Sequence, residues 1–97
     1  MAQVIYSENA LENIERAFAF LAENDLPAAA AAINAMRDSI AILSSHPMIG
    51  RSMDGPLREL VVSFGKTGYV ALYRFRPERD EVRILAIRHQ RELDYPV

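Results

Sequence analysis

The chain has 97 residues, a formal net charge of −2, 51% hydrophobic residues and no cysteine. This length predicts one domain over residues 1–97, with a thin core and little room for a deep pocket. The lack of cysteine excludes disulfides, thiolate nucleophiles and cysteine-based zinc sites. Without a basic, apolar leader or a long uninterrupted apolar run, we expect a cytoplasmic protein with no membrane partner.

Charge is distributed unevenly along the chain. Residues 1–50 carry two basic and six acidic side chains, and residues 51–97 carry nine and seven, so the halves sum to −4 and +2. This asymmetry is too small to predict direct sequence-specific nucleic-acid binding, because phosphate binders usually present a strongly basic face. An anionic partner would approach the carboxyl-terminal half.

The amino-terminal half predicts a short strand followed by two helices. Residues 3–6 suit a strand, and Ser7 is a good N-cap for a helix that ends near residue 23. Asp25 and Pro27 mark the start of a second helix over about residues 26–43, and so short a turn predicts an antiparallel hairpin. Apolar residues at helical spacing predict the buried stripes. These residues are Ala10, Leu11, Ile14, Ala17, Phe18 and Leu21 in the first helix and Ala29, Ala32, Ile33, Met36, Ile40 and Leu43 in the second.

The remaining half predicts an irregular segment over residues 44–56 and then three strands, at 57–64, 69–76 and 81–89. The connections at 65–68 and 77–80 are too short for a parallel crossover, so the strands form an antiparallel meander. The predicted fold is α+β with the order β-α-α-β-β-β. Its N-terminal strand and helix hairpin pack on a mainly antiparallel sheet.

Both faces of this sheet are apolar in the sequence pattern. One helix hairpin covers one face of a sheet, so part of the other face is expected to meet a partner. The pattern does not decide which face the helices cover. Strict alternation places the apolar residues of each strand on two opposite faces. In the first strand Leu60, Val62 and Phe64 lie on one face and Val61 on the other, and in the second Tyr69, Ala71, Tyr73 and Phe75 lie opposite to Val70 and Leu72. In the last strand Val82, Ile84 and Ala86 share one face, and Leu85 and Ile87 lie on the other.

Basic residues near the end of the chain are the main candidates for chemistry. Arg74, Arg88, His89 and Arg91 either form a functional patch or belong to cross-strand ion pairs on a solvated edge. A histidine beside arginines has the chemistry of an acid or base near phosphate, although an orienting role at a surface is more common. No metal-binding motif, glycine-rich phosphate loop or nucleophile elbow is present. We therefore predict no catalytic residue, no metal and no cofactor.

The order of these elements, together with four fragments, resembles the small toxins of the RelE/ParE superfamily from bacterial type II toxin–antitoxin modules. The likeness covers nearly the whole chain and implies a growth-arresting toxin of the plasmid-stabilisation type that a cognate antitoxin neutralises. The fragments are Leu43-x-x-His46-Pro47-x-x-Gly50-Arg51, Leu57-Arg58-Glu59-Leu60-Val61-Val62, Tyr69-Val70-Ala71-Leu72-Tyr73-Arg74 and Val82-Arg83-Ile84-Leu85-Ala86-Ile87-Arg88-His89-Gln90-Arg91.

The superfamily has two branches with different chemistry. RelE-like members are similar to ribosome-dependent messenger-RNA endonucleases, in which attack by the 2′-hydroxyl requires proton-transfer groups and cations. At the matching strand positions this chain has Val61, Ser63 and Val70, and His89, Arg91 and Tyr95 remain in the right region. The resemblance therefore favours the ParE-like branch, which implies inhibition of DNA gyrase by protein binding without enzymatic activity. A RelE-type endonuclease and a non-toxic binding module remain alternatives.

Candidate binding residues follow from this resemblance. A ParD-like antitoxin is expected to cover exposed apolar surface and to place acidic side chains near the arginines. The residues assigned to target contact are Arg74, Arg88, His89, Arg91 and Tyr73. Those assigned to the antitoxin are Leu11, Phe18, Val61, Val70 and Leu72.

Overall fold

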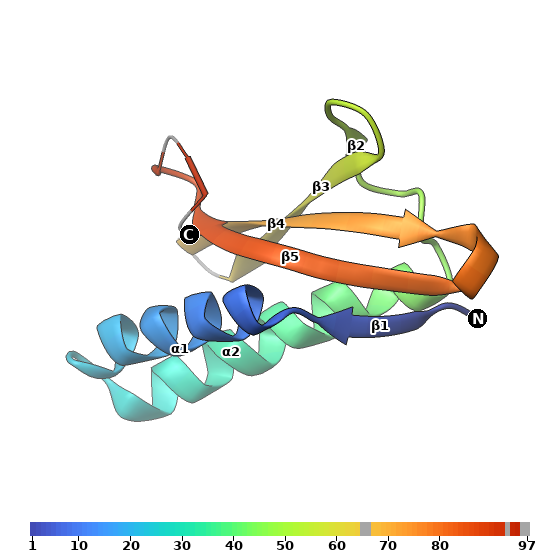
Figure 1. The fold of residues 1–97 in the computed structure, drawn as a ribbon. Coiled ribbons are helices and arrows are strands. Elements are labelled where there is room, and N and C mark those ends of the chain that lie inside the picture. The colour runs from blue at the N-terminus through green and yellow to red at the C-terminus, as the bar shows by residue number, and fades with distance from the viewer. Residues whose placement is uncertain (65–66, 93, 96–97) are drawn as a thin grey trace.

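The computed structural model describes residues 1–64, 67–92 and 94–95, which form a layer of helices against one face of a sheet (Figure 1). This confirms the predicted α+β class and the helix hairpin. The elements are β1 (Gln3–Tyr6), α1 (Glu8–Ala22), α2 (Leu26–Ala41), a 3-10 turn (Ile42–Ser44), β2 (Arg51–Ser52), β3 (Leu57–Phe64), β4 (Thr67–Arg76), a second 3-10 turn (Pro77–Arg79) and β5 (Glu81–His89).

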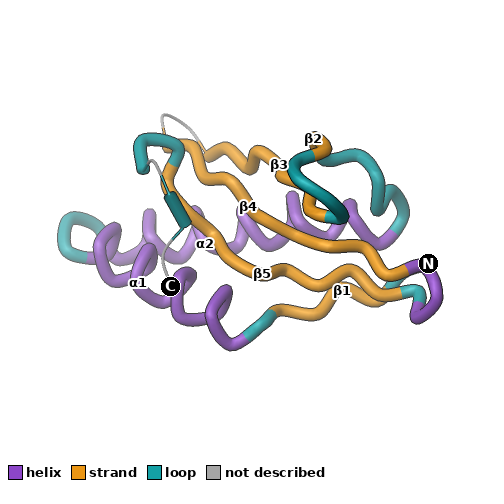
Figure 2. The backbone as a smooth tube through the Cα atoms, turned by 45° about the horizontal axis from the view of Figure 1, so that its top comes forward, coloured by secondary structure: helices purple, strands orange, loops and turns teal. Residues whose placement is uncertain are grey.

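Within the described residues, the sheet has five strands in the order β1-β5-β4-β3-β2 (Figure 2). β3, β4 and β5 form the predicted antiparallel meander, and β1 pairs parallel with β5. β2 was not predicted, and it pairs through Arg51 with Glu59 and through Ser52 with Arg58. β4 begins at Thr67, and the connection predicted at 65–68 lies partly outside the described residues.

Both helices begin at the predicted caps. The backbone N–H of Ala10 donates to the Ser7 hydroxyl at 3.0 Å, and that of Ala28 donates to the Asp25 carboxylate at 3.0 Å. The stripe of α2 is confirmed as a face in contact with the core, but Leu11 of α1 is 48% exposed, so its predicted burial is wrong. α1 instead turns Ala10 and the polar Asn13 toward β5, because the Asn13 side chain bonds to the backbone of that strand.

Ser7 links the start of α1 to the sheet, since its hydroxyl also donates to the carbonyl of Leu85 at 3.1 Å. We expect Ser7→Ala to lower the free energy of unfolding by about 1.5 kcal/mol, from loss of both the cap and the cross-link. Asp25→Ala is the matched control, because the Asp25 cap is exposed, and its cost should be about 0.5–1 kcal/mol. Urea denaturation followed by circular dichroism measures both, and equal losses would contradict the role of the Leu85 bond.

The core lies between the helices and the inner face of the sheet. Leu43 and Ile40 from the helical layer meet Tyr73, Val82 and Ile84 from the sheet, and these five are the largest fully buried side chains among the described residues. The inner face also includes Val62, Tyr69, Ala71 and Ile87. The structure thus decides which apolar face the hairpin covers.

A β-bulge in β5 changes the predicted alternation. Leu72 pairs with Ala86 while Tyr73 pairs with Ile84, which leaves Leu85 as the extra residue. The register after the bulge is shifted by one residue, so Ile87 joins the core and Ala86 faces away from the helices. The predicted assignment of Ala86 to the face of Val82 and Ile84, with Ile87 opposite, is therefore wrong.

The stretch Leu26–Ser44 is apolar enough, by length and composition alone, to qualify as a membrane-spanning helix among the described residues. A core helix that is rich in alanine meets the same test. In this fold, α2 directs Ala29, Met36 and Ile40 into the protein. The stretch is therefore weak evidence for a membrane segment.

Candidate functional site

The predicted basic patch is divided between the two faces of the sheet. The register places Arg88 opposite Val70 and Arg74 opposite Arg83, on the face away from the helices. We call this face, centred on Val61, Val70, Leu72, Ala86 and Arg88, the open face. His89 pairs with Tyr69 of the inner face, so it lies on the helix side, and Arg91 follows the end of β5 on that side.

Tyr73 does not belong to an accessible surface, which corrects its predicted contact with a target. It is fully buried, and its hydroxyl accepts a hydrogen bond from the N–H of Gly50 at 2.8 Å and donates to the carbonyl of Pro47 at 2.8 Å. Arg58, its partner in register, donates to the carbonyl of Gly50 at 2.8 Å. The two side chains hold the loop before β2 against the end of the sheet.

The open face has an apolar centre. Val61 lies directly opposite Val70 in the pairing of β3 with β4, and Val61 is 59% exposed. A shallow hollow of about 340 Å³ surrounds this pair, with polar walls from Arg51, Glu59 and Arg88. Three predicted antitoxin contacts, Val61, Val70 and Leu72, therefore lie together, whereas Leu11 and Phe18 lie on α1 beyond the other side of the sheet.

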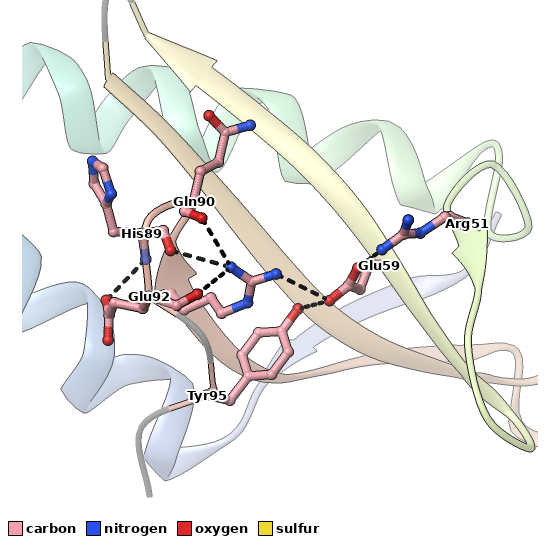
Figure 3. A network of polar contacts seen from close by, with 7 residues as sticks. Arg51, Glu59, His89, Gln90, Glu92 and Tyr95 are labelled. Atoms are coloured by element: carbon pink, nitrogen blue, oxygen red, sulfur yellow. Dashed lines mark hydrogen bonds and ion pairs between the residues drawn. The ribbon is translucent and has the colours of Figure 1, made fainter.

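Glu59 is the centre of a polar network on the open face (Figure 3). Its buried carboxylate accepts hydrogen bonds from Arg51 at 2.6 Å and from the Tyr95 hydroxyl at 2.5 Å, and Arg88 lies at 3.6 Å. Burial alone would raise the pKa of Glu59. The hydrogen bonds from Tyr95 and Arg51, with the charges of both arginines, outweigh burial and lower that pKa below its usual value.

Arg88 and Tyr95 are engaged by the same network. The Arg88 guanidinium donates to the carbonyl of Glu92 at 2.8 Å, and it lies 5.1 Å from the centre of the Tyr95 ring. Burial, followed by the hydrogen bond to Glu59 and the negative charge of that residue, raises the pKa of Tyr95 well above its ordinary value. Tyr95 thus lies over part of the open face, as Figure 3 shows.

A second concave site lies on the helix side, between α1 and the end of β5, with a volume of about 520 Å³. The His89 ring packs edge-on against the Tyr69 ring, with centroids 5.3 Å apart, and its Nδ1 accepts the backbone N–H of Arg91 at 3.1 Å. His89 and Arg91 therefore share this site and are separated from Arg74 and Arg88 by the sheet.

Several residues of both sites were not identified from the sequence. Glu59 and Arg51 come together through β2, whose two residues give no strand pattern. Asn13 could have been identified from the sequence, because it is a polar residue three positions after Ala10 and so interrupts the apolar stripe of the helix. Among the described residues, no group of three or more His, Cys, Asp or Glu side chains is placed to hold a metal ion.

Solved structures define the class of fold. The chain superposes on a chain of the chromosomal ParDE toxin–antitoxin system from P. aeruginosa with a TM-score of 0.74, at 18% identity, covering 92% of this chain and 96% of the other. For the intact E. coli RelBE toxin–antitoxin complex the TM-score is 0.62, at 13% identity, with 90% and 94% covered. The fold is that of the RelE/ParE toxins.

Sequence comparison places the chain within this class. Residues 4–94 match the family described as the ParE toxin of the type II toxin–antitoxin system parDE, so the chain belongs to the ParE toxin family. Toxin RelE3 of Caulobacter vibrioides is 48% identical over 50 residues, which are 52% of this chain and 52% of RelE3. That match spans about half the length of the curated relative. The superfamily predicted from the sequence is confirmed.

Proposed function

We propose that this type II toxin acts by binding a protein, DNA gyrase, and that a ParD-like antitoxin neutralises it. The observation that supports this most is the pairing of Val61 with Val70 on the open face, at positions where a nuclease of the RelE type is expected to carry charge. Val61 offers exposed apolar surface, which suits contact with a protein better than contact with a phosphate.

The charges near this pair also support binding rather than RNA cleavage. Breaking a phosphodiester requires an acid, a base and cations that converge on one phosphate. Arg51 and Arg88 share the carboxylate of Glu59, and the Tyr95 hydroxyl donates to that carboxylate. His89 lies on the opposite side of the sheet, so it does not converge with Tyr95 and Arg88.

Arg74 is the strongest candidate for target contact on the open face. Its Nε is buried and has no hydrogen-bond partner. Among the described residues, it is the one buried side-chain nitrogen or oxygen atom that lacks such a partner. A buried donor without an acceptor is costly in a folded protein. Arg74 as a whole is half-buried, so a rotation of its side chain toward an acceptor on a bound target would remove that cost.

A RelE-type, ribosome-dependent messenger-RNA endonuclease is the second candidate function. The specific observation in its favour is the 48% identity with a protein named Toxin RelE3 over 50 residues. His89 would be the acid–base group in that mechanism, with Arg91 as the nearest cation in the chain.

A supercoiling assay with purified bacterial gyrase tests the proposal. We expect the toxin to reduce supercoiling and to increase gyrase-bound cleaved DNA, and we expect Arg74→Ala to weaken this effect about tenfold, as for loss of a charged hydrogen bond. Arg37→Ala is the control, because Arg37 is exposed on α2, in the helical layer on the other side of the sheet from Arg74.

Two further results would contradict the proposal. New cuts at ribosome-occupied codons, detected by primer extension on messenger RNA and lost in His89→Ala, would establish the endonuclease. Unimpaired growth of cells that express the folded chain without an antitoxin would identify a non-toxic binding module.

A further inference from the structure

We infer that the concave site between α1 and the end of β5 is a docking site for an acidic protein segment that inserts one bulky apolar side chain. We call it the α1–β5 cleft, defined by Asn13, Arg16, Phe20, Tyr69, His89 and Arg91. The inference goes beyond the proposed function, since it does not depend on which target the toxin acts on.

The walls of the α1–β5 cleft include aromatic surface that the protein itself leaves uncovered. Phe20 is 65% exposed although it borders a concavity of about 520 Å³. Tyr69 and Ile87 of the inner sheet face contribute further apolar wall. An exposed aromatic beside a concave, largely apolar surface is the usual anchor point of a protein interface.

Hydrogen-bond donors converge on the same cleft. Asn13 is 5% exposed, and its Oδ1 accepts the N–H of Ile87 at 2.9 Å, which fixes the orientation of the amide. Among the described residues none accepts from the Asn13 amide nitrogen, so that donor is available to a ligand. In neutral His89, the Nδ1 acceptor leaves the proton on Nε2 as a second donor.

Charge selects an anionic partner for these donors. Arg16 and Arg91 lie on the rim of the cleft with Glu92, so the ionised lining side chains sum to +1. One carboxylate oxygen of Glu92 already accepts the backbone N–H of His89 at 3.0 Å. Among the described residues that line the cleft, the charged side chains without an intramolecular hydrogen bond or ion pair are therefore those of Arg16 and Arg91. Their guanidiniums complement carboxylates.

The same features favour a protein segment over nucleic acid. A phosphate backbone requires several free cations, and two arginines beside one glutamate supply little of that charge. The apolar walls match a leucine or phenylalanine side chain, and the donors match glutamate or aspartate on either side of it. A peptide with this alternation satisfies both parts of the α1–β5 cleft.

The test uses the full chain, labelled with ¹⁵N, and three short synthetic peptides. The first has one phenylalanine flanked by glutamates, the second has glutamine for every glutamate, and the third has alanine for the phenylalanine. We expect the first to shift the amide signals of Ala17, Ile87 and His89. We expect each of the other two peptides to bind at least about tenfold more weakly, which corresponds to a loss of ~1.4 kcal/mol in binding free energy.

Two variants locate the binding. Phe20→Ala and Arg91→Gln should each lower the affinity for the first peptide at least about fivefold. Arg79→Gln, at the opposite end of the sheet, should leave that affinity unchanged. Phe20 and Arg91 are both exposed, so circular dichroism should report unchanged folding. Undetectable binding of the first peptide, equal binding of all three, or shifts confined to the open face would overturn the inference. None of these results bears on the gyrase assay.

Discussion

Gly50→Ala is expected to lower the free energy of unfolding by about 3 kcal/mol, at the upper end of the usual cost of overpacking. A Cβ atom at Gly50 would lie 2.6 Å from Cε1 and Oη of Tyr73 and 2.7 Å from the carbonyl oxygen of Glu59. The Tyr73 ring cannot move aside, because it is fully buried and bonded to the loop at Pro47. Urea denaturation at neutral pH measures the loss.

Gly55→Ala provides the comparison for this prediction. Gly55 has a φ of 59°, and a Cβ atom there would have no neighbouring heavy atom within 4 Å, so alanine meets open space but a strained backbone. Its cost should be about 1–2 kcal/mol. If Gly50→Ala costs no more than Gly55→Ala, the close approach of Tyr73 to the loop is not what requires glycine.

Glu59→Gln is expected to lower the free energy of unfolding at neutral pH by about 2 kcal/mol. The substitution keeps the shape of the side chain but removes the charge that Arg88 and Arg51 share. Arg88 suffers most, because its side chain is 16% exposed and would lose its anionic partner. Thermal and urea unfolding of both proteins at constant ionic strength measure the difference.

The effect of Glu59→Gln should disappear in acid. The pKa of Glu59 is lowered in the folded protein, so its contribution is fully present above its unfolded value of 4.5 and is lost as pH falls through the folded value. Wild type and variant should therefore converge once the pH falls below the lowered pKa that Glu59 has in the folded protein. Glu81→Gln is the control, since the similarly buried Glu81 has one ion-pair partner among the described residues, Arg83, at 3.4 Å. A pH-independent difference for Glu59→Gln would contradict the role of its charge.

The secondary structure was largely predictable because it depends on local signals. Ser7 and Asp25 each act as the predicted cap, and the short connection at 77–80 leaves β4 and β5 no choice but antiparallel pairing. The positions of charged groups depend instead on long-range register. Leu85 reads as an ordinary strand residue, and nothing near it in the sequence signals that the α1 cap bonds to its carbonyl.

The predicted site failed in part for the same reason. Tyr73 and His89 were grouped with Arg74 and Arg88 because they are close in sequence, but strand neighbours point to opposite faces. Leu11 fits the helical stripe by spacing, yet the Asn13 bond to Ile87 rotates that stripe toward β5. Glu59 gave no sign of burial, since its partners Arg51 and Tyr95 are distant in the chain.

The bulge at Leu85 has a consequence for how this chain tolerates a change of length. Leu85 is the extra residue, so a chain that lacks it would still pair Ile84, Ala86 and Ile87 with Tyr73, Leu72 and Ala71, and every later side chain of β5 would keep its face. Such a chain would lose the carbonyl that accepts hydrogen bonds from the Ser7 hydroxyl and the Asn9 amide. The extra residue therefore serves the attachment of α1 to the sheet, and a relative shorter by one residue here would keep both faces of the sheet but would have to hold the start of α1 by other contacts.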